Sequence, residues 1–398
     1  MKRIRVGLLI GSMRGGGSER QTLLLLSHLD RERFEPTLIV SEAVGDLMEK
    51  VPDDVAVKAF GLPSDDDNGS FFGWGARIPG AAFRRWSCRL ADVVRSVRPD
   101  VLYDRTLTMT RLAASAVDPA RLPRVSTLVS PPSMALPHLE KRYVYWKRRS
   151  LRQAYLRSRF VIAVSDAVAE DACRYYDIES ARIETINNPV DISRIQTDSM
   201  AGDSDGNFHR RECGDRVSLV CVGRMSNEKG QSTLLEALRR LQTRSDIPPL
   251  RLTLVGDGPD RRKLEVIARM IDRHHVEFVG QIANPLPLIR NADALISPSR
   301  FEGSPNVVLE AFALRTPVIA SRGSGAETFA NGNATMRLFD VDDAESLSLQ
   351  IVDLIQRHER TDALSNAASE YLLAHHDVSR CVGRIERLLS DAATHSAG

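Results

Sequence analysis

Residues 294–311 read ALISPSRFEGSPNVVLEA, a short apolar run followed by a polar loop and a second apolar run. The run 294–297 has the length and composition of a buried strand, and Pro305 fits the first turn of a helix with Ser304 as its N-cap. A buried strand that leads through a short loop into a helix is the repeating unit of a parallel α/β sheet. The backbone amides of residues 303–307 would then form an anion-binding cradle at the helix start.

The pattern of that segment repeats along the whole chain. Short runs rich in β-branched residues alternate with longer amphipathic stretches, as in sheets whose parallel strands are joined by crossover helices. We expect strands at residues 3–10, 36–41, 55–60, 100–104, 124–129 and 160–164 in the first half, and at 217–222, 250–255, 276–279, 294–297, 317–321 and 335–339 in the second. The sequence therefore predicts an α/β protein with two doubly wound sheets.

The length of the chain also indicates two domains. A chain of 398 residues is longer than one hydrophobic core usually organises. Between the two groups of strands, residues 197–216 are rich in Asp, Ser, Gly and Arg and have no apolar period, which is typical of a linker. We place a first domain at residues 1–192, a second at 193–375 and a terminal helical segment at 376–398.

Composition excludes several classes of protein. Hydrophobic residues make up 42% and charged residues 27%, with a net charge of +2, which is unlike disordered or collagen-like chains. No run of 18 apolar residues without a charge is present, and the short apolar run after the basic start does not resemble a secretory signal. The five scattered cysteines fit neither a disulfide framework nor a zinc site, so we expect a cytoplasmic protein without a metal site.

Two further loops have the chemistry of anion binding. Residues 15–20 read GGGSER after the first strand, where Gly16 and Gly17 let a phosphate approach the backbone at a helix start. Residues 222–230 read VGRMSNEKG, where Arg224 can bind one phosphate with its guanidinium fork and Lys229 can give a point charge to the next. Taken singly, each pattern also occurs in simple turns and solvated loops. At the carboxyl edge of a parallel sheet, however, the second favours a diphosphate ligand.

Two carboxylates flank the helix start expected at Pro305. Glu302 precedes it, and Glu310 follows it by five residues, about 7.5 Å along a helix axis. These carboxylates can therefore contact separate ends of one long ligand. Paired carboxylates about 5 to 9 Å apart also occur in glycosidases. A hydrolase of neutral glycans has no use for Arg224 and Lys229, so we favour a substrate that contains phosphate.

Together the motifs resemble glycosyltransferase family 4, retaining enzymes of the GT-B fold that use nucleotide sugars. Besides the three segments above, the chain has AVSDAV at 163–168, INNPVD at 186–191, LVGDGP at 254–259 and TPVIAS at 316–321, in the family's order. The resemblance implies two Rossmann-like domains that face each other across a cleft, with a last helix that returns to the first domain. Residues 302–311 are similar to enzymes that build bacterial polysaccharides and lipid-linked oligosaccharides.

The resemblance also implies roles for individual residues. Arg224 and Lys229 would hold the diphosphate and stabilise the leaving group, and Glu302 would lie by the hydroxyls of the donor sugar; these are the expected catalytic residues. The expected donor-binding positions are Gly16, Gly17, Gly223, Gly303, Ser304, Pro305, Asn306 and Glu310, with Glu310 on the ribose hydroxyls. Front-face displacement, in which the departing phosphate helps to deprotonate the acceptor, requires no cofactor and no metal beside the nucleotide-sugar cosubstrate.

The function that the resemblance implies is retaining hexosyl transfer. A hexose or N-acetylhexosamine would pass from a nucleotide sugar, with UDP favoured over GDP, to a glycan or polyprenyl-linked acceptor in cell-surface polysaccharide biosynthesis. Two departures keep alternatives open. The histidine usual near the reacting centre is absent from residues 127–133, where Ser130 or Ser133 would take its place, and Ala334 replaces a usual glycine. A noncatalytic nucleotide-sugar-binding subunit and a nucleotide-sugar epimerase of the same fold are the alternatives.

A basic and aromatic stretch indicates where the acceptor binds. Residues 138–160 hold eight Lys and Arg side chains against one acidic side chain. The membrane or acceptor patch that we expect consists of Lys141, Arg142, Trp146, Lys147, Arg148 and Arg149. One interpretation is peripheral contact with anionic lipid at the inner face of the cell membrane, and the other is a solvated basic helix whose aromatic residues pack inward. The near-neutral net charge argues against nucleic acid as a partner.

Overall fold

The computed structural model of the chain describes residues 2–61, 81–140, 142–201, 216–323, 325–332 and 334–394. The chain divides into two compact units, one of Met1–Pro189 with Val378–Gly398 and the other of Val190–Asp377. The chain thus passes between the units at 189–190 and again at 377–378, rather than in the polar segment 197–216. That segment begins inside a helix of the second unit, and residues 202–215 lie outside the described part.

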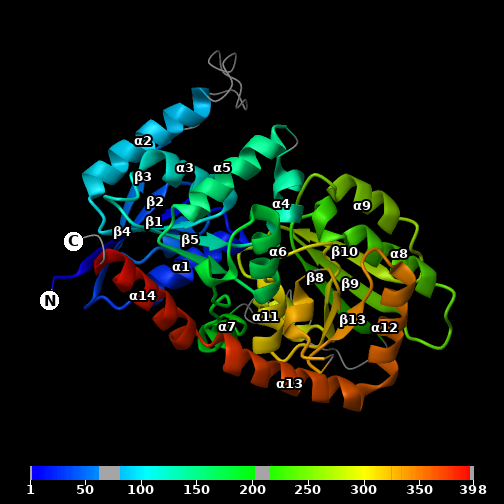
Figure 1. Cartoon of the computed structure of the whole chain (residues 1–398). Coiled ribbons are helices and arrows are strands. Elements are labelled where there is room, and N and C mark those ends of the chain that lie inside the picture. The colour runs from blue at the N-terminus through cyan, green and yellow to red at the C-terminus, as the bar shows by residue number, and fades with distance from the viewer. Residues whose placement is uncertain are drawn as a thin grey trace. The chain divides into compact units, whose positions relative to one another are not determined.

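Unit 1 is built on a seven-stranded parallel sheet with the strand order β3-β2-β1-β4-β5-β6-β7 (Figure 1). Its strands are β1 (Ile4–Ile10), β2 (Phe34–Val40), β3 (Ala56–Ala59), β4 (Val101–Arg105), β5 (Arg124–Leu128), β6 (Phe160–Ala163) and β7 (Ile183–Thr185). Its helices are α1 (Gly17–His28), α2 (Ala81–Val97), α3 (Leu107–Ala116), α4 (Pro132–Leu139), α5 (Val144–Leu156), α6 (Asp166–Tyr176) and α14 (Val378–Thr394).

Both faces of this sheet are covered, because successive strand side chains point in opposite directions. Along β1, Val6, Leu8 and Ile10 join one core with α1 and α14, whereas Leu9 joins a second core with α2 and α3. A third core lies under α4, α5 and α6. Strands that are apolar on both faces are the physical reason that the first half could be predicted as a parallel sheet.

The last helix, α14, belongs to unit 1 although it follows unit 2 in the chain. Its apolar stripe of Cys381, Val382, Ile385, Leu388 and Leu389 is buried in the core that also contains α1. Glu386 on the same helix accepts a hydrogen bond of 2.8 Å from the backbone amide of Asp30. Apolar burial and this buried carboxylate together hold the end of the chain on unit 1.

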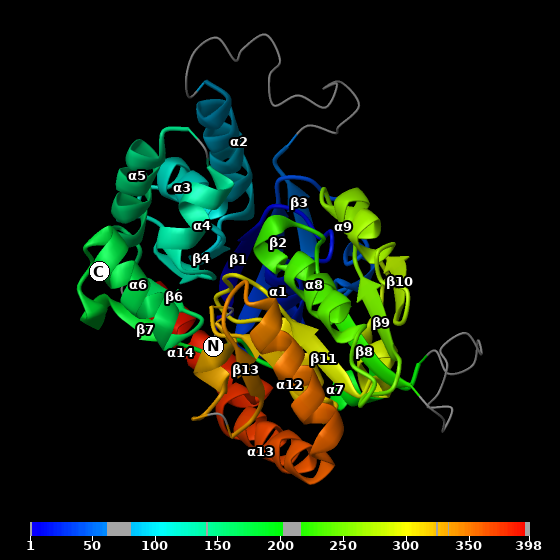
Figure 2. The same cartoon turned by 90° about the vertical axis from the view of Figure 1, so that its right-hand side faces the viewer.

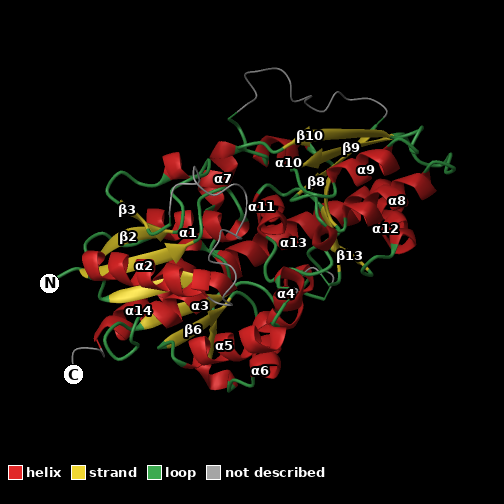
Figure 3. Cartoon of the chain, turned by 90° about the horizontal axis from the view of Figure 1, so that it is seen from above, coloured by secondary structure: helices red, strands yellow, loops and turns green. Residues whose placement is uncertain are grey.

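Unit 2 contains a six-stranded parallel sheet with the order β10-β9-β8-β11-β12-β13 (Figure 3). Its strands are β8 (Val217–Val222), β9 (Leu250–Val255), β10 (His275–Gly280), β11 (Ala294–Ser297), β12 (Val318–Ser321) and β13 (Arg337–Phe339). Its helices are α7 (Ile192–Asp198), α8 (Gln231–Leu241), α9 (Arg261–Ala268), α10 (Leu286–Asn291), α11 (Asn306–Ala313), α12 (Ala344–Gln356) and α13 (His358–His376).

The sheet of unit 2 also has two buried faces. Leu219, Cys221 and Ile296 pack in one core with helices α8, α9 and α12, and Figure 2 shows α8 beside α12. On the other face, Val220 and Leu295 pack with α10, α11 and α13. The predicted fold class is therefore confirmed: both units are doubly wound α/β sheets.

Two details differ from the expectations. Strand β7 was not predicted, since it has only three residues, which are half-buried and include Glu184. Helix α11 begins at Asn306 with Pro305 as its N-cap, so Ser304 is not the cap, as we expected, and lies one residue before it. Among the described residues, no helix is long and apolar enough to cross a membrane.

Candidate active site

The candidate site in unit 2 lies where the order of its strands reverses. From β8 the chain leads to β9 on one side, while β11 pairs with β8 on the other side. The loops after β8 and β11 therefore leave the sheet next to each other at its carboxyl edge, which is the usual ligand position in open α/β sheets. The predicted Arg224–Lys229 turn follows β8, and the Glu302–Asn306 segment follows β11.

The turn after β8 presents Arg224 to solvent. Arg224 is exposed, and its guanidinium makes no hydrogen bond or ion pair with a residue of the described chain. Its backbone is fixed, because its carbonyl oxygen accepts a hydrogen bond of 2.9 Å from Nε2 of Gln231. A free guanidinium on an anchored backbone is suited to bind phosphate oxygens in a bidentate way.

Two glycines after β9 hold that turn in place. A Cβ on Gly256, whose φ is 128°, would lie 2.2 Å from the carbonyl oxygen of Gly223, and a Cβ on Gly258 would lie 2.3 Å from that of Met225. Backbone hydrogen bonds of 2.9 Å also run from Gly223 to Val255 and from Met225 to Asp257. The LVGDGP motif therefore supports the Arg224 turn through close backbone packing.

Lys229 and Glu302 meet across the two loops. Nζ of Lys229 lies 3.0 Å from Oε1 of Glu302, and the two side chains are 25% and 17% exposed. The hydroxyl of Ser299 donates a hydrogen bond of 2.6 Å to the same carboxylate oxygen. Glu302 is thus held in place by two partners, and a phosphate that approaches Lys229 has to compete with it.

A buried thiol lies within the electrostatic reach of this ion pair. Cys221 is the second-last residue of β8, directly before Val222, and is 4% exposed. Burial raises the pKa of its thiol to about 12, with a smaller opposing influence from Lys229. The thiol is therefore neutral at physiological pH and acts here as a small apolar side chain.

The segment after β11 contains a buried hydroxyl without a partner. Oγ of Ser304 is buried and makes no hydrogen bond, although Ser304 immediately precedes the N-cap of α11. Gly303 and Pro305 are buried, while Asn306 and Glu310, in the first turns of α11, are half-buried. An unpaired buried hydroxyl at a helix start is a suitable partner for a ligand oxygen.

The turn after β12 packs directly against this segment. A Cβ on Gly325, whose φ is 72°, would lie 2.6 Å from the carbonyl oxygen of Glu302, and a Cβ on Gly323 would lie 2.6 Å from that of Arg300. Only glycine permits this approach, which fixes the backbone on both sides of Glu302. Ser324, between the two glycines, lies outside the described residues.

The remaining predicted site residues belong to unit 1. Gly16 is the N-cap of α1 and Gly17 its first residue, and both are exposed after β1. Gly16 has a φ of −69°, so its backbone does not require glycine, whereas Gly15 has a φ of 101°. In this glycine loop, the backbone conformation of Gly15 therefore requires a glycine. Gly15 lies directly before Gly16 and Gly17, the two residues that we expected to approach a phosphate.

The two serines that follow β5 differ in their contacts. The hydroxyl of Ser133 donates a hydrogen bond of 2.6 Å to Asp171 on α6, and its amide donates another of 2.9 Å. The hydroxyl of Ser130 makes no hydrogen bond within the described part of the chain. Ser133 therefore connects α4 to α6, which leaves Ser130 as the serine available to a ligand.

The basic and aromatic stretch forms an exposed surface on α4 and α5. Leu139, Tyr143 and Trp146 are 67%, 63% and 66% exposed, so these large side chains do not pack inward. Of the six patch residues, Arg142, Trp146, Arg148 and Arg149 are exposed, Lys147 pairs with Glu140, and Lys141 lies outside the described residues. Of the two interpretations of this stretch, the one in which the aromatic residues pack inward does not hold for Tyr143 and Trp146.

Not every arginine of this patch is free. Nε of Arg148 donates to the carbonyl oxygen of Tyr175 at 2.6 Å, and Arg152 donates to that of Tyr176 at 2.7 Å, so both cap the end of α6.

Within the described ranges, no cluster of three or more His, Cys, Asp or Glu side chains is placed to hold a metal ion.

Comparisons with known proteins assign the chain to a family. The model of "Glycosyltransferase Family 4" matches residues 15–194, and that of "Glycosyl transferases group 1" matches residues 216–357. The chain belongs to the family 4 glycosyltransferases. The resemblance inferred from the motifs is therefore confirmed.

Several curated relatives of this glycosyltransferase are known. A GDP-mannose-dependent alpha-(1-6)-phosphatidylinositol monomannoside mannosyltransferase of Mycolicibacterium smegmatis is 33% identical over 49% of this chain and 54% of that protein. The lipopolysaccharide core biosynthesis glycosyltransferase LpsE of Rhizobium meliloti is 29% identical over 40% of this chain and 45% of that protein. The chain spans about half the length of these curated relatives.

Solved structures of similar fold cover almost the whole glycosyltransferase chain. Anabaena HepE in complex with UDP-glucose superposes with a TM-score of 0.77 at 20% identity, covering 98% of this chain and 100% of that one. WaaG, a glycosyltransferase of lipopolysaccharide biosynthesis, gives a TM-score of 0.70 at 15% identity, with 96% and 99% covered. These likenesses confirm the GT-B fold.

Proposed function

We propose that the chain is a retaining hexosyltransferase. It transfers a hexose or N-acetylhexosamine from a nucleotide sugar, with UDP-sugar as the favoured donor, to a glycan or polyprenyl-linked acceptor in cell-surface polysaccharide biosynthesis. The observation that carries this proposal is the exposed, unpaired guanidinium of Arg224 on the same turn as Lys229, which pairs with Glu302 at the strand reversal of unit 2. These groups suit a diphosphate with a sugar attached.

The chemistry that we assign needs orientation and charge stabilisation more than a protein nucleophile. The bond between the anomeric carbon and the phosphate oxygen breaks, and a bond from the acceptor oxygen forms on the same face of the sugar. The acceptor proton passes to the departing phosphate, so atoms and charge balance. Arg224 and Lys229 stabilise the negative charge that develops on the leaving diphosphate, while Glu302 contacts sugar hydroxyls.

The donor is tested by binding. Thermal unfolding of the full chain is followed with UDP, GDP, UDP-glucose, UDP-N-acetylglucosamine and GDP-mannose; a ligand at 100 times its Kd adds about 2.7 kcal/mol to the stability. We expect the uridine compounds to stabilise the chain more than the guanosine compounds. Stabilisation by guanosine compounds alone would overturn the UDP preference, and the absence of stabilisation by all five would overturn the transferase.

The retaining outcome is tested with the product. With the donor that binds, NMR of the transferred sugar reports its anomeric configuration, which we expect to equal that of the donor. An inverted product would contradict front-face displacement even if transfer is fast. Cell extract serves as the first acceptor source, with lipid-extracted material as its matched control.

A noncatalytic nucleotide-sugar-binding subunit is the second candidate. One observation favours it: the hydroxyl of Ser133, which would take the place of the absent histidine, is engaged by Asp171. Donor binding without transfer to any acceptor of a membrane extract would support this candidate. We favour the transferase because Ser130 is still available and because phosphate-assisted deprotonation requires no histidine.

We further propose that the transferase binds the inner face of an anionic membrane through α4 and α5. Exposed Leu139, Tyr143 and Trp146 provide amphipathic and apolar contact, and Arg142 and Arg149 provide charge for lipid phosphates. This combination of large exposed side chains and cations supports a lipid surface over a purely solvated helix.

Vesicle flotation tests the membrane contact. We expect the chain to float with vesicles that contain phosphatidylglycerol and to stay unbound with phosphatidylcholine alone. The variants Trp146→Ala and Arg149→Gln should weaken binding, each by about 1 kcal/mol or more. Trp86→Ala is the matched control, because Trp86 packs on Phe60 with ring centroids 6.0 Å apart. Binding that ignores the anionic lipid would contradict the proposal.

A further inference from the structure

Unit 1 has a strand reversal of its own, between β1 and β4. From β1 the chain leads through α1 to β2 on one side, while β4 pairs with β1 on the other. The register places Leu9 opposite Asp104, so the glycine loop after β1 and Arg105 at the end of β4 leave the sheet at the same place. This is the ligand position of an open α/β sheet.

Arg105 is a buried cation whose hydrogen-bond partners are both neutral. It is 4% exposed. Its Nη1 donates to the hydroxyl of Tyr103 at 3.0 Å and its Nη2 to the side-chain oxygen of Asn188 at 3.2 Å. Its Nε is buried and has no partner. A buried guanidinium without a hydrogen-bonded anion is unfavourable, because hydrogen bonds to neutral groups offset its desolvation only in part.

The other buried arginines of the described chain are paired. Arg124, on the neighbouring strand β5, is 1% exposed and lies 3.2 Å from Asp104. Arg337 in unit 2 is 3% exposed and lies 3.0 Å from Asp353. Unlike these two arginines, Arg105 has no carboxylate as a hydrogen-bond partner. It lies at the carboxyl edge of its sheet, where ligands bind in open α/β sheets.

The residue after Arg105 is strained. Thr106 has a φ of 74°, in a region that β-branched residues rarely adopt, and it makes no side-chain cap although it is the N-cap of α3. Such outliers gather at binding sites, where the surrounding structure holds them in place. The strain fixes the direction in which the chain leaves β4 directly beside Arg105.

Glu19 on α1 is a carboxylate whose charge acts on Arg105 without a hydrogen bond between them. Burial raises the pKa of Glu19, with a smaller opposing influence from Arg105. Burial favours the neutral form of the Glu19 carboxyl, so Glu19 is a poor counterion for Arg105. A stronger anion, such as a phosphate, can take its place.

We propose that Arg105 binds a phosphoryl group of the acceptor at the strand reversal of unit 1. The inference rests on the proposed function, and it narrows the acceptor to one that carries a phosphate, such as a sugar phosphate or a lipid-linked sugar diphosphate. Nε of this guanidinium is unpaired and the partners of Nη1 and Nη2 are neutral, so its N–H groups can donate hydrogen bonds to a phosphate oxygen. The diphosphate of the nucleotide sugar is the other ligand that could supply such a phosphate.

Phosphate binding to the full chain tests the site. The double variant Arg224→Ala with Lys229→Ala lacks the two cations of unit 2 that are expected to bind phosphate. Inorganic phosphate is titrated into this variant and followed by 31P NMR. We expect binding that weakens about tenfold or more in Arg105→Gln. Arg105→Lys should lose less, since it keeps the charge without the fork, and Glu19→Gln should bind more tightly. Arg121→Gln is the control, because Arg121 lies on the surface of unit 1.

A second arm separates the two sources of phosphate. Wild-type chain is saturated with the nucleoside diphosphate that binds, and inorganic phosphate is titrated again. Retained binding supports an acceptor site, whereas its loss assigns the anion to the donor and overturns the acceptor site. Equal binding by Arg105→Gln also overturns it, and if that variant does not fold by circular dichroism, Arg105→Lys and Glu19→Gln decide. Phosphate binding through Arg105 in a chain that binds no nucleotide would overturn the proposed transferase function and the assignment of the phosphate to an acceptor. The anion-binding site at Arg105 would still stand.

Discussion

Nζ of Lys229 lies 3.0 Å from Oε1 of Glu302, although the two residues follow different strands of unit 2. The pair joins the loops at the strand reversal, and the hydroxyl of Ser299 donates a hydrogen bond of 2.6 Å to the same carboxylate oxygen. Before a ligand binds, Glu302 thus neutralises part of the charge of Lys229. In the proposed reaction, a phosphate that binds Lys229 would replace Glu302 as its partner, and Glu302 would then be able to contact the donor sugar.

The first prediction concerns Glu302→Gln. The isosteric amide removes the charge that competes for Lys229, so affinity for the nucleoside diphosphate should stay equal or rise severalfold. The rate of sugar transfer should fall about 100-fold, as for the loss of one stabilising contact in the transition state. Calorimetric titration and initial rates measure the two effects on the same preparation. A loss of nucleotide affinity with an unchanged kcat would contradict both roles.

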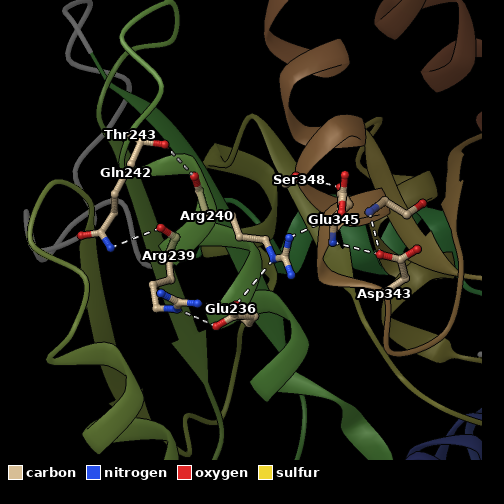
Figure 4. A network of polar contacts seen from close by, with 9 residues as sticks. Glu236, Arg239, Arg240, Gln242, Thr243, Asp343, Glu345 and Ser348 are labelled. Atoms are coloured by element: carbon tan, nitrogen blue, oxygen red, sulfur yellow. Dashed lines mark hydrogen bonds and ion pairs between the residues drawn. The ribbon is translucent and has the colours of Figure 1, made fainter.

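The second prediction concerns Arg224→Ala. The guanidinium is exposed and unpaired, so its removal should leave the melting temperature unchanged and reduce kcat/KM about 100- to 1,000-fold. Arg240→Ala is the matched control on the same unit. Figure 4 shows Arg240 in a surface network, where it lies 3.5 Å from both Glu236 and Glu345. Such exposed pairs contribute about 1 kcal/mol at most, so the control should keep full activity.

The sheets could be predicted because their strands carry a strong signal. Strands β8, β9 and β11 match the expected bounds, since buried runs of Val, Leu and Ile lie between polar turns. Short β7 has no such signal, as three half-buried residues cannot be told from a loop. The crossing at 189–190 lies three residues before the expected boundary at 192–193, in an ordered segment where the amide of Val190 donates a hydrogen bond of 2.8 Å to the carbonyl oxygen of His376.

The candidate site could be predicted only in part. The types of residue at 224, 229 and 302 indicate phosphate and sugar chemistry, but the contact between Lys229 and Glu302 depends on the strand order. Gly256 stands in a motif that carries the family resemblance, but the sequence does not show its structural role, which is close contact with the backbone of Gly223. Arg105 has no signal in the sequence, since a single polar residue at a strand end is common.

The third prediction is a pH dependence of stability. Arg5 donates three hydrogen bonds to Asp100, the shortest of them 2.7 Å, and this pairing lowers the pKa of Asp100. Because the folded pKa lies below the unfolded value of about 3.9, the stabilisation is present above that pH and is lost as the pH falls. Asp100→Asn should therefore lower the free energy of unfolding by roughly 1 kcal/mol at pH 7.

Denaturant unfolding between pH 3 and pH 7 measures this difference. The gap between wild type and Asp100→Asn should narrow as the pH falls below about 4, because the unfolded state then binds a proton at Asp100 that the folded state, with its lowered pKa, resists. Asp118→Asn is the control, because Asp118 lies 3.8 Å from exposed Arg121 in a weak pair. A gap that stays constant across the range would show that Asp100 stabilises the fold without its charge.

The last prediction compares two glycine substitutions. A Cβ at Gly256 would lie 2.2 Å from the carbonyl oxygen of Gly223 at a φ of 128°, so Gly256→Ala must move the turn that holds Arg224. Gly383, inside α14, has no atom within 4 Å of an added Cβ. Gly256→Ala should therefore destabilise the chain by about 1 kcal/mol or more and weaken nucleotide binding, whereas Gly383→Ala should stabilise it by up to about 1 kcal/mol. Thermal unfolding with and without nucleotide separates the two effects. Unchanged nucleotide binding in Gly256→Ala would mean that the position of Arg224 does not depend on the packing of these two loops.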